Sequence, residues 1–462
     1  MSSPSELRQG LRQRHLTMIA VGGSIGAGLF VGSGSVISRV GPAAFLTYAI
    51  TGVLVVMVMR MLGEMAAAEP STGSFADYSG TSLGRWAGFS VGWLYWYFWV
   101  IVVGFEAVAG AAILQRWVPG VPLWMMAFGL LVLMTLTNLV SVKSYGEFEY
   151  WFAAIKVTCI IAFLVLGSAF ALGLWPGQDL DFSNLTAHGG FMPEGWGSVA
   201  SGAVVVVFSM VGAEIATVAA AESSEPETAV AKATNSTVVR VALFYVGSLF
   251  LLVVLLPWNS ASILDSPFVT ALDTMGVPAA ADLMNFVVLT AVLSCLNSGL
   301  YTASRMLFAL SGRGEAPKAM SEVNERGVPT RAVLASTVIG FAGVIAAYSS
   351  PEKVFTFLLN SSGAVVLFVY LLICLSELRM RRRLEAEAPE RLIVKMWCYP
   401  VLPIVAAVAI VGILVWMLVD DTSRTQVLCS LGSWAFALVM YGVIRRRERA
   451  REQVAVRVEA AV

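Results

Sequence analysis

Histidine, cysteine and charged side chains are scarce in this 462-residue sequence. Its two histidines, His15 and His188, lie far apart, and no glycine–lysine dipeptide occurs. This excludes a histidine-based metal centre, a histidine-dependent hydrolase and a P-loop that binds ATP. The five cysteines lack the spacing of metal ligands, so we expect free thiols. We therefore predict no catalytic site, no metal and no cofactor, and the zero formal net charge does not favour a nucleic-acid partner.

Charged residues make up 13% of the chain and hydrophobic residues 58%, with a mean hydropathy of +0.78. A soluble protein cannot bury that much apolar surface, whereas a membrane protein exposes it to lipid. We predict an all-α polytopic membrane protein with twelve transmembrane helices, each close to or above the roughly 20 apolar residues that cross a bilayer. The predicted spans are 17–37, 42–68, 86–116, 122–141, 150–174, 197–221, 238–258, 282–310, 331–349, 353–376, 398–420 and 425–445.

The basic residues divide unequally between the two sides of this topology. Of the 30 Lys and Arg residues, only Arg39, Arg116, Lys353 and Arg424 fall on the outer side. Because cytoplasmic loops carry the excess of Lys and Arg, both termini are predicted to lie in the cytoplasm.

Two of the predicted spans are interrupted. The first reads MIAVGGSIGAGLF over 18–30 and holds four glycines within seven residues, and the second reads FSMVGAEIAT over 208–217. Lipid does not tolerate unpaired backbone N–H and C=O groups, so such breaks line a cavity or bind a ligand. Paired breaks at matching positions in two halves are typical of secondary transporters with inverted repeats and a substrate at the midplane.

We therefore predict two five-span repeats of opposite orientation, with spans one and six broken. Two extra helices would support packing or dimer contacts, in a protein that is a monomer or a homodimer. The predicted divisions are a cytoplasmic arm at 1–16, a transporter domain at 17–445 (first repeat about 17–174, second repeat about 197–376, extra helices about 398–445) and a cytoplasmic tail at 446–462.

The half-helix that follows the first break presents free N–H groups, which favour an anion such as a substrate carboxylate. The alternative is close helix packing through small residues. Packing usually requires glycines four residues apart on one face, whereas these glycines point in several directions. Phe208 at the second break is a candidate aromatic gate, with simple packing as the alternative. The aromatic residues at 93–99 cover all faces of span three, and we assign most of them to packing.

Three ionisable side chains, Glu106, Lys156 and Glu214, lie within predicted spans, where charge is costly and marks functional sites. Counted from the predicted span ends, Lys156 and Glu214 both lie about 10 Å from the inner surface, which makes a shared proton-handling site a reasonable hypothesis. Snorkelling of Lys156 and a structural hydrogen bond of Glu214 are the alternatives. Glu106 lies near the midplane, where it could receive a substrate ammonium or make a polar contact between helices.

Four segments resemble the amino acid–polyamine–organocation (APC) superfamily, and the resemblance covers essentially the whole chain. Within its bacterial amino acid permease branch, GRWAGFSVGWLYWYFWV and the segment around Glu106 are most similar to the γ-aminobutyrate (GABA) permeases. The four segments are RHLTMIAVGGSIGAGLFVGSG, GEFEYWFAAIKV, FSMVGAEIATVAAAESSEPETAVAKATN and SCLNSGLYTASRMLFALSGRGEAP.

The resemblance implies a LeuT-type 5+5 inverted repeat plus two helices, with proton-coupled uptake by alternating access. It implies that Lys156 stands where related transporters bind a second sodium ion and that Glu214 belongs to a proton-linked network. Glu106 would influence substrate specificity. The residues that would bind the substrate are Ser24, Ile25, Gly26, Ala27 and Gly28 at the first break, Phe208, Ser209 and Gly212 at the second, and Glu106.

We thus expect a multi-pass protein of the inner or plasma membrane that imports a small zwitterionic amino acid, with GABA the leading substrate, by proton symport. Its partners would be the amino acid, protons and membrane lipids. The alternatives are an amino-acid exchanger, a permease for an aromatic, proline-like or cationic amino acid, and an amino-acid sensor that does not transport.

Overall fold

The computed structural model describes residues 13–22, 25–71, 73–220, 226–348, 362 and 364–459. All regular structure in these ranges is helical. The helices of the first half are α1 (Gln13–Gly22), α2 (Ala27–Phe30), α3 (Gly32–Val40), η1 (Gly41–Ala43), α4 (Ala44–Ala68), α5 (Phe75–Leu83), α6 (Arg85–Leu114), α7 (Leu123–Val140), α8 (Val142–Ala171), η2 (Ser183–Leu185), α9 (Gly195–Met210) and α10 (Ile215–Ala220).

The second half continues the bundle, and the π-helical segment η3 joins α11 and α12 without a loop between them. The helices of this half are α11 (Pro226–Arg240), η3 (Val241–Gly247), α12 (Ser248–Leu255), α13 (Ser262–Asp265), α14 (Pro267–Thr274), α15 (Ala280–Gly312), η4 (Lys318–Ser321), α16 (Thr330–Ala347), α18 (Val365–Glu387), η5 (Pro389–Arg391), α19 (Val401–Val419) and α20 (Arg424–Glu459).

The described residues contain nine helical segments that are long and apolar enough to cross a membrane, and a shorter apolar helix at Thr330–Ile345. The prediction of an all-helical, multi-pass membrane protein is therefore supported. The count of twelve spans stays a prediction, since residues 353–361 and 363 of predicted span 353–376 lie outside the described residues. The nine are Gly28–Ala68, Arg85–Leu114, Leu123–Val140, Val142–Ala171, Gly195–Ala219, Thr234–Leu255, Ala280–Gly312, Val401–Val419 and Arg424–Ala450.

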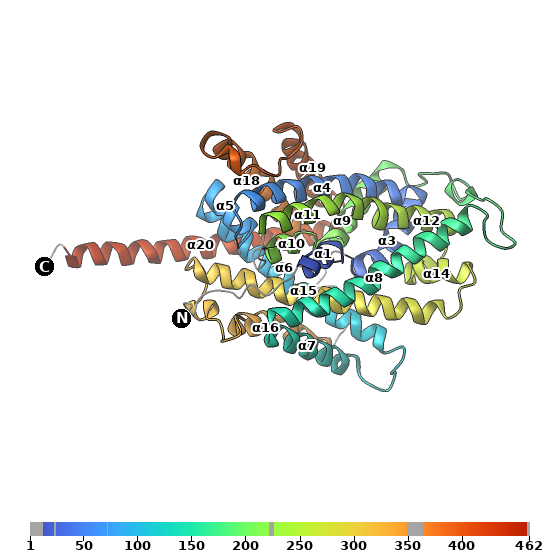
Figure 1. Ribbon diagram of the computed structural model, residues 1–462, viewed down its shortest axis with the longest axis horizontal. Helices are drawn as coiled ribbons and strands as arrows, with labels where there is room; N and C mark the ends of the chain where they lie inside the picture. The colour runs from blue at the N-terminus through green and yellow to red at the C-terminus, as the bar shows by residue number, and fades with distance from the viewer. Residues whose placement is uncertain are drawn as a thin grey trace.

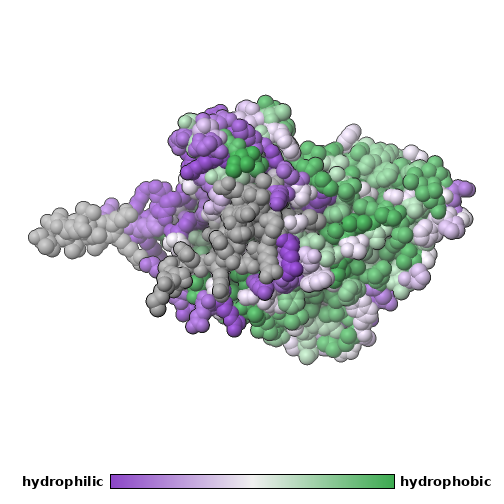
Figure 2. Space-filling view, in the orientation of Figure 1, coloured by the Kyte–Doolittle hydropathy of each residue, from purple (hydrophilic) through white to green (hydrophobic). Residues whose placement is uncertain are grey.

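The long helices lie roughly side by side, and the C-terminal part of α20 projects from one end of the bundle (Figure 1). Apolar side chains cover a broad belt of the visible surface, and hydrophilic side chains gather at the end from which α20 projects (Figure 2). Such a belt suits a lipid environment, because exposed apolar area of this extent is unfavourable in water.

Both predicted breaks are present. The first helix ends at Gly22, and helix resumes only at Ala27 in the short α2. The second break follows Met210: Val211 is extended with ψ 145°, and Gly212 adopts φ +106°, a conformation that side chains other than glycine rarely tolerate. The helix then resumes at Ile215.

One helix boundary differs from the sequence prediction in a way that affects the site. Helix α8 begins at Val142, where Ser141 caps it by accepting a hydrogen bond from the backbone N–H of Ser144 at 3.0 Å, and not at the predicted span start of Tyr150. The charged residues of the motif GEFEYW therefore lie inside this helix. Residues 226–237, which lie between predicted spans 197–221 and 238–258, are helical in α11.

Ion pairs join α4 to α18 at the bundle end near the C-terminus. Arg381 binds Glu64 at 2.7 Å with both side chains buried, and Arg383 binds Glu69 at 2.7 Å. Glu377, one helical turn before Arg381, is completely buried, and its two carboxyl oxygens have no hydrogen-bond partner among the described residues.

Candidate functional site

The two breaks meet backbone to backbone. A Cβ atom on Gly28 would lie 2.7 Å from the Cα of Ser209, so no larger residue fits there without a shift of one segment. The carbonyl oxygen of Ser209, freed by the break, accepts a hydrogen bond from the Tyr245 hydroxyl at 3.1 Å. The Ser209 hydroxyl donates to the carbonyl of Val206 at 2.8 Å. The junction is therefore tight, and its polar groups are paired.

A small cavity of about 30 Å³ lies beside this junction. Helices α6 and α15 complete its walls, so segments from both halves of the chain enclose it. Its lining residues are Gly26, Gly28, Phe98, Trp99, Val102, Glu106, Phe208, Ser209, Val211 and Cys295.

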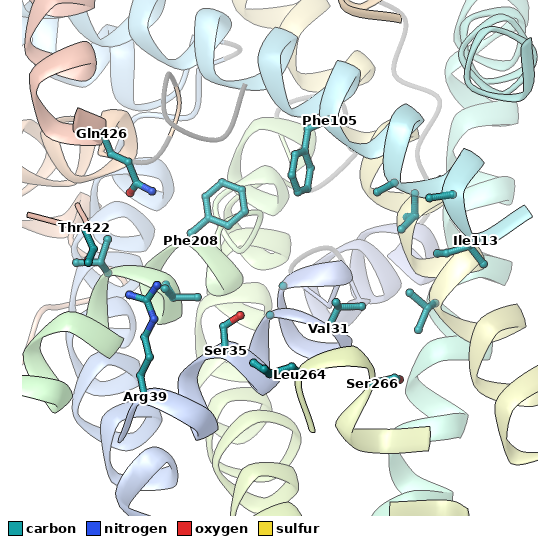
Figure 3. A pocket seen from close by; sticks show the side chains of 18 of the residues that line it. Val31, Ser35, Arg39, Phe105, Ile113, Phe208, Leu264, Ser266, Thr422 and Gln426 are labelled. Carbon is teal, nitrogen blue, oxygen red and sulfur yellow. The ribbon is translucent and has the colours of Figure 1, made fainter. Parts of the chain in front are cut away.

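A much larger cavity, the vestibule, has a volume of about 910 Å³ and is lined by residues of α3, α6, α9, α15 and the segment 420–426, among others. Phe208 and Gly28 line both spaces. Figure 3 shows Phe105 and Phe208 close to each other at the vestibule, with Arg39 and Gln426 on the side of Phe208 that is away from Phe105. The two phenylalanine rings pack edge to face with their centroids 6.4 Å apart. Phe208 of this pair stands between the vestibule and the small cavity, and Phe105 lines the vestibule alone.

Glu106 supplies the carboxylate of the small cavity. It is 4% exposed, and its Oε2 has no hydrogen-bond partner among the described residues. Burial of a carboxylate without a partner is costly, which makes this oxygen a candidate to bind a ligand donor.

Glu214 holds the second break together. Its Oε1 accepts a hydrogen bond from the Tyr95 hydroxyl at 2.9 Å. Its Oε2 accepts from the Tyr370 hydroxyl at 3.2 Å and from the backbone N–H of Gly212 at 3.1 Å. The carboxylate thus joins the unwound turn to α6 and α18.

Lys156 is completely buried on α8 and donates a hydrogen bond to the Ser294 hydroxyl of α15 at 2.8 Å. Ser294 in turn donates to Glu149 Oε1 at 2.5 Å. The charged partner of Lys156 in this chain of hydrogen bonds is therefore Glu149, which lies seven residues earlier on the same face of its own helix.

The structure gathers part of the predicted substrate set around the small cavity: Gly26, Gly28, Glu106, Phe208 and Ser209. Ile25 is buried beside the first break, and Gly212 forms the turn of the second without lining the cavity. Ser24 lies outside the described residues, and of Ala27 only the helical backbone is described.

Lys156 and Glu214 were predicted to share a site because their depths are similar. Each has its own partners on different helices, and the described residues make no hydrogen bond that joins the two. Depth along a helix carries no information on the direction in which a side chain points.

Several residues of the site were missed in the sequence. Tyr95 was assigned to packing within the aromatic cluster, and Glu149 lay just before the predicted start of its span. Ser294 and Cys295 open the quoted segment SCLNSGLYTASRMLFALSGRGEAP, and the sequence alone did not single them out. A helical-wheel comparison of α8 with α15 would have found Glu149, had the helix start been known. The described residues contain no group of three or more His, Cys, Asp or Glu placed to hold a metal ion.

Comparison with known proteins identifies relatives over nearly the full length. Residues 15–454 match the family described as amino acid permease. The chain is 54% identical to the γ-aminobutyric acid permease of Bacillus subtilis, over 96% of this chain and 95% of that protein. It is 47% identical to the γ-aminobutyric acid permease of Escherichia coli, over 95% and 94%. It is also 42% identical to the aromatic amino acid transport protein AroP of Corynebacterium glutamicum, over 91% and 92%.

Proposed function

The chain belongs to the amino acid permease family, and from this membership we propose that it imports a small zwitterionic amino acid, with GABA as the leading substrate. Two relatives named as GABA permeases, at 54% and 47% identity, support this substrate. Transport proceeds by proton symport with alternating access, in a twelve-span bundle of two inverted repeats and two further helices.

The observation that carries this proposal is the small cavity in which both breaks and Glu106 meet. GABA bears a carboxylate and an ammonium at the two ends of a short chain. The N–H groups of the first break, including the Ser24–Gly28 segment, would bind the carboxylate. The Glu106 carboxylate would accept the ammonium as a charge-assisted hydrogen bond.

Substrate entry requires a movement of the aromatic pair. A cavity of about 30 Å³ holds on the order of two water molecules, which is less than an amino acid needs. Phe208 lines both this cavity and the vestibule, so rotation of its ring joins the two spaces. Phe208 then closes over the bound substrate. In this proposal, the present arrangement is a state in which the vestibule is open.

The vestibule faces the outside in this proposal. It lies beside residues 420–426, at the start of α20, whereas the C-terminus lies at the other end of this helix. The opposite end of the bundle is closed by ion pairs of Arg313 with Asp77 and with Glu315. The concentration of Lys and Arg in the predicted inner loops supports cytoplasmic termini.

Lys156 and Glu214 carry the coupling to protons, through separate hydrogen-bond networks. Lys156 is a buried cation whose proton affinity is sensitive to its surroundings. Glu214 ties the second break to α6 and α18, so a change in its protonation would alter three contacts at the point where the helix must move.

Uptake by the purified protein in proteoliposomes tests the proposal. We expect labelled GABA to accumulate when the inside is made alkaline and to fail to accumulate without the pH gradient. Glu106→Gln should raise the KM for GABA, because the ammonium loses a charged acceptor.

A panel of labelled amino acids in the same vesicles separates the alternatives. Counterflow that ignores the pH gradient would identify an exchanger, and binding without flux would identify a sensor. Preference for an aromatic, proline-like or cationic amino acid over GABA would overturn the substrate assignment.

A further inference from the structure

Glu149 is a buried carboxylate that the proposed transport mechanism does not yet use. It is completely buried, and its Oε1 accepts the 2.5 Å hydrogen bond from Ser294, which itself accepts from Lys156. Its other oxygen, Oε2, has no hydrogen-bond partner among the described residues. We propose that Glu149 is the proton-accepting partner of Lys156, reached through the Ser294 hydroxyl. This inference rests on the proton-coupled transport proposed above and adds a residue to it.

The arrangement repeats along two facing helices. Tyr145 lies four residues before Glu149 on α8, and Ser298 lies four residues after Ser294 on α15, so each pair shares a helical face. The hydroxyls of Tyr145 and Ser298 are 3.3 Å apart. We call Lys156, Ser294, Glu149, Ser298 and Tyr145 the α8–α15 polar ladder. It runs from the buried Lys156 toward the N-terminal end of α8, the end predicted to face the cytoplasm.

Charge balance supports a pairing of Lys156 with Glu149. A fully buried ammonium needs an anionic partner, because otherwise no attractive interaction offsets the free energy lost when it is removed from water. The carboxylates that favour the charged form of Lys156 are Glu149 and Glu106, and the Arg240 guanidinium opposes it. Glu106 faces the small cavity, and Glu149 is the carboxylate that one hydroxyl joins to Lys156.

The other elements packed against α8 add few competing charges. Helices α7 and α12 contain no titratable side chain. On α1, Arg14 and His15 bind Glu147 rather than Glu149. On α15, Arg305 lies over the Tyr301 ring, with its Cζ 4.1 Å from the ring centroid, and Tyr301 stacks on Tyr145 at 4.0 Å.

The transfer step conserves atoms and charge. The Lys156 ammonium gives a proton to the Ser294 oxygen as the Ser294 hydroxyl proton moves to Glu149 Oε1. One N–H bond and one O–H bond break, two O–H bonds form, and the ion pair becomes a neutral amine and a carboxylic acid. When the inner side opens, Glu149 releases this proton to water, and Lys156 takes a new proton from the outer side in the next cycle.

Glu149→Gln tests the proposal, with uptake and counterflow measured on the same proteoliposomes. Glutamine keeps the size and one acceptor oxygen but cannot take the proton. We expect counterflow of GABA, which needs no net proton release, to persist, and accumulation driven by a pH gradient to be lost. Ser294→Ala should shift the pH profile of uptake, since Ser294 acts only by positioning and relaying. Glu147→Gln is the matched control on the same helix, and it should retain accumulation.

Each other result contradicts the assignment. Accumulation by Glu149→Gln with an unchanged pH profile would exclude Glu149 from the proton path. Loss of both counterflow and accumulation, in a variant that still folds by thermal unfolding in detergent, would give it a structural role alone. If the wild-type protein itself transports without any dependence on the pH gradient, the proposed symport fails instead, and the two failures are thereby distinguished.

Discussion

Gly26 and Gly28 line the same small cavity but have different room around them. A Cβ on Gly26 would meet the Cys295 Cβ at 3.8 Å, an ordinary contact, whereas on Gly28 it would lie 2.7 Å from backbone of the other break. In the sequence the two glycines are equivalent members of one cluster. The requirement for glycine at position 28 depends on a segment 180 residues away, and no local pattern could reveal it.

Gly28→Ala should therefore abolish most transport, since the added methyl group forces α2 and α9 apart at the junction. Gly129→Ala, at a glycine of α7 where an added Cβ would have no atom within 4 Å, is the control and should retain transport. The measurement is the initial rate of GABA uptake, normalised to the amount of protein in the membrane. Equal rates for the two variants would mean that the junction is not rigid.

Glu214→Gln should sharply impair proton-driven uptake. The amide replaces one acceptor oxygen with a donor, which then faces either a tyrosine hydroxyl or the Gly212 N–H. Loss of a hydrogen bond to a charged group costs about 1.5–3 kcal/mol, or roughly tenfold or more in an equilibrium. Tyr370→Phe removes one donor only and should have a milder effect. Uptake by Glu214→Gln at the wild-type rate at every pH would leave Glu214 without a role in coupling.

At the scale of elements, the sequence predicted both broken helices because glycine clusters and an intramembrane carboxylate are visible without any fold. It misplaced the start of α8, since hydropathy marks where apolar residues begin and not where the helix begins. One face of the first turns of α8, with Val142, Tyr145, Gly146 and Glu149, is buried in the protein. For that reason Glu149 was counted outside the span and was not considered as a partner of Lys156.

The contact of α18 with α4 makes the free energy of unfolding depend on pH, through Glu377. Burial raises the pKa of Glu377 to about 8 from its ordinary value of 4.5, and the nearby Glu64 carboxylate adds to the increase. The folded protein therefore favours the protonated acid. The contribution of the protonated Glu377 to the stability of the fold is fully present below the pKa of this residue in the unfolded chain. It is lost as the pH rises through its pKa in the folded protein.

Glu377→Gln, neutral at every pH, should raise the thermal unfolding temperature relative to wild type at about pH 9 and much less at about pH 5. Glu387→Gln, at an exposed position of the same helix, is the control and should follow the wild-type pH dependence. The measurement is the unfolding temperature in detergent across this range. A constant difference between Glu377→Gln and wild type would show that the residue does not titrate there.

At the scale of the whole molecule, α20 runs as one helix from the vestibule to the projecting C-terminal end. Gln426 lines the vestibule, and Arg447 lies 21 residues further along the helix. At 1.5 Å per residue, about 30 Å separates them, which matches the hydrocarbon thickness of a bilayer. The last two predicted spans were expected only to support packing or a dimer, but the segment that joins α19 to α20 forms part of the vestibule wall.

In a background without the native cysteines, Gln426→Cys should react with a membrane-impermeant maleimide added to intact cells. Arg447→Cys, on the same helix, should react only after the cells are permeabilised. The extent of labelling of Arg447→Cys measures on which side of the membrane the C-terminal end lies, and that of Gln426→Cys measures access to the vestibule from outside. Labelling of Arg447→Cys in intact cells would contradict the proposed topology. Failure of Gln426→Cys to react in intact cells would mean that the vestibule is closed from outside.

The backbone contact between Gly28 and Ser209 tolerates substitution less well than the cavity wall does, and this difference has a consequence for evolution. The joint is a main-chain contact at Gly28, where no side chain fits without a shift, whereas Glu106 and Cys295 reach the cavity as side chains from α6 and α15. Selection can alter the chemistry of these walls by single replacements and leave the joint intact. A diverging lineage built on this scaffold would therefore change what it carries sooner than how it moves.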